Sequence, residues 1–230
     1  MTSAKPTPLT ATEHDVPSRD GAKDSAKERL RRAAAPLFAE RGIDGVSVKE
    51  VADAAAMNIS AVSYHFGGKE ALYLNCLEQF GEQELHTIEK LLQPSSTLEE
   101  FRLRLRLFLD EIISAHLREP SASKMLWNEV DQGFPHGHEV FKNTFAKLFL
   151  TWVAFIDHAT QSKFLRQDLD AQTTAGIIIG ALSHCLRTDK VGAMFFGRSI
   201  TRTEDRERLL HHLIEISLYG ILPPHDSERK

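Results

Sequence analysis

The chain has 230 residues, of which 42% are hydrophobic and 26% charged, and its formal net charge is −4. This length allows one small domain and one of medium size, and the composition is typical of a globular protein. The charge argues against a strongly basic nucleic-acid-binding protein, but DNA binding requires only a local basic patch.

Residues 1–24 are rich in Thr, Pro, Ser, Asp and Lys and contain no apolar core. We therefore expect a disordered tail and no signal peptide. No run of about 18 apolar residues is present, which predicts no membrane span. Cys76 and Cys185 lie far apart in helical patterns, which is typical of a reduced, cytoplasmic protein. The pattern leaves any redox role of these cysteines open.

The segment from Ser25 to Gly42 predicts a first helix. Ser25 and Glu28 have the spacing of a capping box, and Gly42 is a stop signal. Apolar residues follow at helical spacing and form one face: Leu30, Ala34, Leu37 and Phe38.

Residues 47–69 have the pattern of two short helices joined by a tight turn. Ser47 and Glu50 form a capping box that begins the first short helix. Asn58 is a good cap for the second, which we expect from about Ile59 to His65, and a glycine pair ends it. Such a unit usually places its second helix in the major groove of DNA.

The sequence of residues 37–73, LFAERGIDGVSVKEVADAAAMNISAVSYHFGGKEALY, resembles the amino-terminal DNA-binding domain of the TetR family of bacterial transcription regulators. Residues 58–74, NISAVSYHFGGKEALYL, further resemble the CecR-type branch of that family. Two departures concern the DNA surface: Ala56 stands where the family often has glycine, and Ala61 where threonine is frequent.

The resemblance gives the polar face of the second short helix a role. We expect base-edge contacts from Ser60, Ala61 and Tyr64. Phosphate contacts are expected from a further set: Ser47, Lys49, His65 and Lys69. Asn58, the expected cap of the second short helix, belongs to the same DNA-binding surface. The alternative is a small helical bundle with a solvated polar surface.

The remainder of the chain shows only helical patterns. We expect helices over residues 70–92, 97–118, 121–131, 138–160, 170–188 and 201–220, with a loop at 133–137. The predicted fold class is all-α, with a helix-turn-helix domain at 25–80, a larger helical effector-binding and dimerisation domain at 81–222, and a tail at 223–230.

The helices expected over residues 170–188 and 201–220 are apolar on more than one face, which indicates that they are deeply buried or contact a partner chain. We expect a homodimer through a four-helix bundle, and the TetR resemblance implies the same dimer. The expected interface residues are Ile178, Ile179, Leu182, Leu209, Leu213 and Ile216. A larger monomer core is the alternative.

Aromatic residues are frequent in the carboxy-terminal half. They suit a pocket for an apolar or aromatic ligand, although aromatics at helical spacing also form ordinary core. The expected lining is Leu105, Trp127, Phe141, Phe145, Phe149 and Trp152. The resemblance implies an effector site in this region without identifying the effector.

No enzyme motif is present, neither a G-x-S-x-G elbow nor a phosphate-binding glycine loop nor H-E-x-x-H. We expect no catalytic residues, no metal site and no cofactor. The sequence favours a dimeric repressor that binds a palindromic operator and is released by a small molecule. An activator or a ligand-independent regulator stays open, as does a helical ligand-binding protein or enzyme without operator preference. The sequence does not identify the operator, the regulated genes or the effector.

Overall fold

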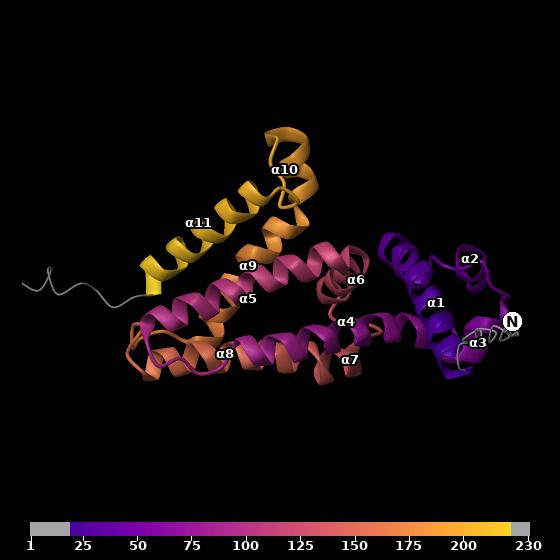
Figure 1. Ribbon diagram of the computed structural model, residues 1–230, viewed down its shortest axis with the longest axis horizontal. Coiled ribbons are helices and arrows are strands. Elements are labelled where there is room, and N and C mark those ends of the chain that lie inside the picture. Colours follow the sequence, from indigo (N-terminus) through magenta and orange to yellow (C-terminus); the bar gives the residue numbers. More distant parts are fainter. Residues whose placement is uncertain (1–18, 222–230) are drawn as a thin grey trace, which may run out of the picture.

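The computed structural model describes residues 19–221, and within this range it contains eleven α-helices and no strand. The all-α fold class is therefore confirmed. The helix-turn-helix lies at one end of an elongated molecule, and the longer helices form a bundle at the other (Figure 1). Residues 1–18 of the expected amino-terminal tail, and the tail at 223–230, lie outside the described residues.

Three helices form the amino-terminal unit: α1 (Arg19–Arg41), α2 (Val48–Ala54) and α3 (Ser60–Phe66). Because α1 begins at Arg19, Ser25 lies inside the helix, and the predicted capping box at Ser25 is wrong. Gly42 ends α1 in the left-handed conformation, as expected, with φ of 70°. Leu30, Phe38 and Val62 are almost fully buried in the shared core.

Two long helices connect this unit to the bundle. α4 (Lys69–Leu91) runs from the helix-turn-helix into the bundle, and α5 (Leu98–Arg118) packs against it (Figure 1). Both match their predicted ranges. Thr97 caps α5 by accepting the Glu100 backbone N–H at 3.1 Å. The following α6 (Pro120–Asp131) begins with proline, whose missing N–H is no loss at a helix start.

The single helix expected over residues 138–160 is divided in two, α7 (His138–Asn143) and α8 (Phe145–Gln161). The break falls at Thr144, whose ψ of −77° and φ of −121° interrupt the helix. Thr144 lies against Gly81 of α4, where an added Cβ would approach the threonine Oγ1 to 2.7 Å. This close crossing of α4 requires a glycine, and no local pattern predicts it.

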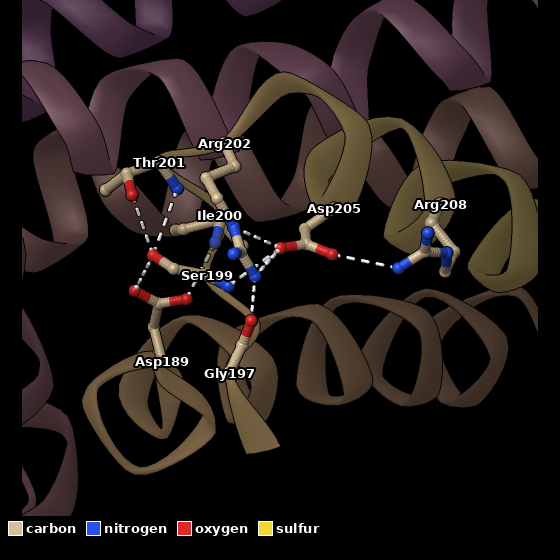
Figure 2. Close-up of polar contacts among 8 residues, drawn as sticks. All are labelled: Asp189, Gly197, Ser199, Ile200, Thr201, Arg202, Asp205 and Arg208. Atoms are coloured by element: carbon tan, nitrogen blue, oxygen red, sulfur yellow. Dashed lines mark hydrogen bonds and ion pairs between the residues drawn. The ribbon is translucent and has the colours of Figure 1, made fainter. Parts of the chain in front are cut away.

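The last three helices are α9 (Ala171–Arg187), α10 (Asp189–Phe196) and α11 (Thr203–Ile221). The sequence reading missed α10. It also placed the start of the last helix at residue 201, whereas α11 begins at Thr203 after a loop that is held by a hydrogen-bond network (Figure 2). Asp189 accepts hydrogen bonds from the Ile200 N–H at 2.8 Å and from the Ser199 hydroxyl at 2.9 Å. Asp205 binds the Ser199 N–H and the Arg202 side chain, so the loop between α10 and α11 is fixed at both ends.

The core of the bundle is built from α4, α5, α8, α9 and α11. Its largest member, Trp152, is almost fully buried and donates from Nε1 to the Ala175 carbonyl at 3.0 Å. Arg206 anchors α11 to α5 through the Asp110 carboxylate, with Nε to Oδ1 at 2.7 Å. No helix within residues 19–221 is long and apolar enough to cross a membrane.

Candidate DNA-binding surface and ligand cavity

The start of α2 is held by the capping box that the sequence predicts. The Ser47 hydroxyl accepts the Glu50 N–H at 3.2 Å, and Glu50 Oε2 accepts the Ser47 N–H at 2.8 Å. Glu50 Oε1 also accepts a hydrogen bond from Arg41 at 2.7 Å. The backbone N–H of Ser47, followed by Arg41, lowers the pKa of Glu50 to about 2. The box therefore fixes α2 with a carboxylate that is ionised at neutral pH.

The turn between α2 and α3 is fixed from two sides. The N-cap position of α3 is Ile59 and not Asn58 as expected, although Asn58 Oδ1 still accepts the N–H of Ser60, the first residue of the helix, at 3.0 Å. Ala56 takes the left-handed conformation, with φ of 51°, that glycine adopts more readily. Arg29 of α1 donates to the Ala55 carbonyl at 2.8 Å. No local pattern in the sequence predicts that Arg29 reaches this turn.

The outer face of α3 is presented to solvent. Tyr64 is 71% exposed and contacts the His65 ring edge-on, with ring centroids 4.9 Å apart. Val62 is fully buried and Phe66 packs partly against the same core. The exposed and half-exposed residues of this face are Ser60, Ala61, Ser63, Tyr64 and His65. None of them is acidic, so the face suits an anionic polymer.

Some of the residues expected to contact phosphates already form hydrogen bonds within the protein. Lys49 is exposed on α2. Lys69, at the start of α4, donates from Nζ to the Val46 carbonyl at 3.0 Å, which ties α4 to the loop before α2. The Ser47 hydroxyl serves the cap. Lys69 keeps two further N–H groups, so its position at the rim of the α3 face is compatible with a phosphate.

Helix α6 joins the helix-turn-helix to the bundle. Met125 of α6 is fully buried in the core of the amino-terminal unit. Asn128 donates to the Ala39 carbonyl at 3.2 Å, and Lys124 pairs with Glu40 at 2.8 Å. One side of α6 is thus fixed to α1 by apolar, hydrogen-bond and ionic contacts.

A buried carboxylate strengthens this junction. Glu129 of α6 accepts the Tyr73 hydroxyl at 2.7 Å, and its other oxygen accepts the Gly137 N–H at 2.9 Å. Burial, together with the hydrogen bond to Glu129, raises the pKa of Tyr73 far above its usual value. Tyr73 lies on α4, so a single carboxylate connects α4, α6 and the loop before α7.

The other side of α6 faces a cavity of about 320 Å³ inside the bundle. Its walls come from α4, α5, α6, α7, α8 and α9 and from the loop before α7, and they are mostly apolar and aromatic. The lining includes five of the six predicted pocket residues: Trp127, Phe141, Phe145, Phe149 and Trp152. Leu105 does not line this cavity, and its side chain is buried elsewhere in the core of the bundle. The sequence reading missed Glu84, a polar member of the wall, which no motif distinguishes.

The predicted dimer residues do not share one exposed face. Ile178 and Leu182 are buried in the core of the protomer, so they cannot contact a partner, and this part of the prediction is wrong. Ile179 lines the cavity. Leu209 and Leu213 pack partly against the core, and Ile216 is 73% exposed. The error follows from helical phase, since α9 turns Ile178 and Leu182 inward and Ile177 outward.

A different face of α9 is open. Ile177 is 67% exposed, and an added Cβ at Gly176 or Gly180 would meet no atom of the described residues within 4 Å. No described helix of the same protomer packs closely against these two glycines.

The geometry defines a helix-turn-helix domain joined to a helical bundle. Residues 30–76 match the family described as bacterial regulatory proteins, tetR family. The probable HTH-type transcriptional regulator YttP of Bacillus subtilis is 31% identical over 108 residues, which are 47% of this chain and 52% of YttP. The dual regulator CecR of Shigella flexneri is 42% identical over 55 residues, 24% of each protein. The chain thus spans about half of the first relative and a quarter of the second.

Solved structures share the fold over a longer range. The ketosteroid transcriptional regulator KstR2 of Mycobacterium tuberculosis superposes with a TM-score of 0.68 at 18% identity, covering 86% of this chain and 95% of that one. FadR of Bacillus subtilis, in complex with stearoyl-CoA, gives 0.67 at 16% identity, covering 84% and 98%. The amino-terminal part of the chain is thus similar to bacterial regulatory proteins of the tetR family. The relatives named here are transcription regulators rather than enzymes.

Proposed function

We propose that this protein is a DNA-binding transcription regulator that acts in the cytoplasm and places α3 in the major groove. The observation that carries the proposal is the exposed, acid-free face of α3 around Tyr64, held in position by Asn58 and Arg29. A reading helix has to present short polar or aromatic side chains from a rigid backbone, and both conditions are met.

Each group on this surface has a distinct role. Ser60 and Tyr64 contact base edges, and the Ala61 methyl meets an apolar base group such as the thymine methyl. Lys49, His65 and Lys69 contact phosphates, which position the helix without reading sequence. Ser47 contributes through the capping of α2, whose hydrogen bonds are already made.

The second part of the proposal is a homodimer that binds a palindromic operator. The open face of α9 offers Ile177 beside two glycines, and α11 offers the exposed Ile216. Helices with small residues approach closely and bury their neighbours, so two copies would form a four-helix contact from these faces. A two-fold dimer places its reading helices about 34 Å apart or slightly more, which requires a two-fold operator.

The third part is release of DNA by a small molecule in the cavity. Helix α6 supports this route because its two sides serve different partners. Trp127 and Leu126 line the cavity, whereas Met125 and Asn128 contact α1. A ligand that displaces α6 therefore displaces the helix-turn-helix. Coupling of about 1–2 kcal/mol changes DNA affinity roughly 5–30-fold. FadR, a structural neighbour, is described with stearoyl-CoA bound.

Selection of bound sequences from a random DNA pool at fixed salt tests the DNA proposal. The wild-type protein should enrich one palindrome, and Tyr64→Ala should lose it. Lys49→Ala should weaken binding to all sequences and lower the salt slope by about one phosphate contact. Lys147→Ala, a change of an exposed lysine on α8, should do neither. Failure to enrich any sequence would favour a helical ligand-binding protein without operator preference.

Sedimentation analysis tests the dimer. The wild type should sediment as a dimer, and Ile177→Glu with Ile216→Glu should give monomers, because both changes bury charge in the proposed contact. Leu103→Glu on α5, also exposed, is the matched control and should stay dimeric. A monomeric wild type would contradict this part alone.

A further inference from the structure

The walls of the cavity have an unusual distribution of charge. Among the described residues that line it, Glu84 is the one carboxylate, His116 is the one imidazole, and no lysine or arginine is present. Burial lowers the pKa of His116, which favours the neutral ring. Its Nδ1 is already engaged with the Ser123 hydroxyl at 2.9 Å. The wall therefore offers an incoming molecule a carboxylate among apolar groups.

Glu84 is only 6% exposed, and its two oxygens differ. Oε1 accepts a hydrogen bond from Arg118 Nη2 at 3.1 Å. In the described part of the chain, Oε2 is buried and has no hydrogen-bond partner. Burial raises the pKa of Glu84, and the nearby Arg118 guanidinium opposes that rise. A buried carboxylate oxygen without a donor is costly, so a group that supplies the donor would gain that energy.

The charges around Glu84 do not balance. Arg118 bridges Glu84 and Glu111, with its distance to Glu111 at 2.6 Å. With both carboxylates ionised, this group of three side chains has one negative charge in excess. Arg118 is half exposed and reaches Glu84 from the solvent side. The cavity side of Glu84 is thus the place where a further positive charge is favourable.

Aromatic rings surround the same space. Phe80, Phe145 and Trp127 line the cavity together with Glu84. The Trp127 Nε1–H is also buried without an acceptor in the described residues. Ring faces attract cations, and the attraction increases when water is excluded. The volume of about 320 Å³ is near the lower end of the roughly 300–1,000 Å³ of ligand pockets, which suits a compact molecule.

We propose that the cavity binds a compact aromatic or apolar amine in its protonated form, with the ammonium donating to Glu84 Oε2. This deepens the proposed function, because it names the chemical class of the effector and rests on the cavity being the effector site. An organic acid of the same size is disfavoured, since its carboxylate would meet Glu84 with no cation on the wall to balance it.

Calorimetry on the full chain without DNA tests the proposal with three probes of one shape: phenylbutylamine, phenylbutanol and phenylpentanoate. At neutral pH the amine should bind roughly tenfold or more tightly than the alcohol, and the acid most weakly. Glu84→Gln should reduce amine affinity by roughly tenfold or more and change alcohol affinity by less than about threefold. Glu82→Gln, an equal charge change on the exposed side of α4, should leave all three unchanged.

Equal binding of amine and acid would overturn the proposal, and so would the absence of binding by all three at millimolar concentration. An equal loss for all probes in Glu84→Gln would also overturn it. Thermal unfolding monitors whether this variant folds, and the wild-type order of affinities remains a test in either case. Because DNA is absent, the outcome is separate from operator binding. An amine that binds through Glu84 without weakening operator binding would refute its effector role and leave the ligand class standing.

Discussion

The α3 face and the cavity differ in how their polar groups are satisfied. On the α3 side the groups are exposed and pair locally, as Glu50 does with Ser47 and Asn58 with Ser60. In the cavity wall, Glu84 Oε2 and Trp127 Nε1 are buried and unpaired among the described residues. A surface that is complete by itself is ready to meet DNA, whereas a wall with unpaired groups gains energy from a ligand.

The largest expected effect is a loss of stability when a buried residue of the cavity wall is truncated. Trp152→Ala should lower the free energy of unfolding by about 3–5 kcal/mol, because a fully buried indole and its bond to the Ala175 carbonyl are lost. Urea unfolding followed by circular dichroism measures this change. Leu150→Ala, exposed on the same helix, should stay within about 0.5 kcal/mol. Similar losses in both variants would show that the bundle core is not centred on Trp152.

A smaller loss of stability is expected at the junction between the helix-turn-helix and the bundle. Tyr73→Phe should cost about 1.5–3 kcal/mol, because it leaves Glu129 Oε1 buried without its 2.7 Å donor. Denaturant titration of the full chain measures the loss. Tyr64→Phe removes the same hydroxyl from an exposed ring and should leave stability unchanged while it weakens DNA binding. A stability loss for Tyr64→Phe would mean that the reading face is not free.

A substitution in the turn between α2 and α3 is expected to increase the stability of the protein. Ala56→Gly should stabilise the protein by about 0.5–1 kcal/mol, since glycine accepts the left-handed conformation more readily than alanine. Thermal unfolding monitors the gain. The same change at Ala154, exposed inside α8, should instead cost about 1 kcal/mol. A loss at Ala56 would argue that its φ of 51° carries no strain.

The weakest effect is a pH dependence at the α2 cap. The folded pKa of Glu50, about 2, is below its ordinary value of 4.5, so its ionised form stabilises the fold above pH 4.5. That contribution should fall as the pH drops from 4.5 towards 2. Urea unfolding of wild type and Glu50→Gln across this range should show the difference between them shrinking in acid. A constant difference would show that the charge of Glu50 does not act through the cap.

Local signals determined the helix-turn-helix. The Ser47–Glu50 box and the left-handed Gly42 are found where the spacing predicts them, because each depends on residues within a few positions. The apolar faces of α4 and α5 were readable for the same reason, since helical periodicity is itself local.

Other errors came from contacts between distant segments. The break at Thr144 faces Gly81 of α4, which lies sixty-three positions earlier in the chain. The loop before α11 is held by Asp189 of α10, which accepts the Ile200 N–H. Ile178 and Leu182 were assigned to a partner because an all-apolar helix does not show which face its own protomer covers.

The sequence by itself determined the helix class, the two short helices with the Ser47 cap of the first, and the aromatic character of the cavity. Tertiary structure alone decided that Arg29 fixes the turn, that α6 contacts both the cavity and α1, and that Glu84 keeps one oxygen unpaired beside aromatic rings. Caps and periodicity act over one or two helical turns, whereas these features depend on side chains brought together from separate helices when the bundle packs.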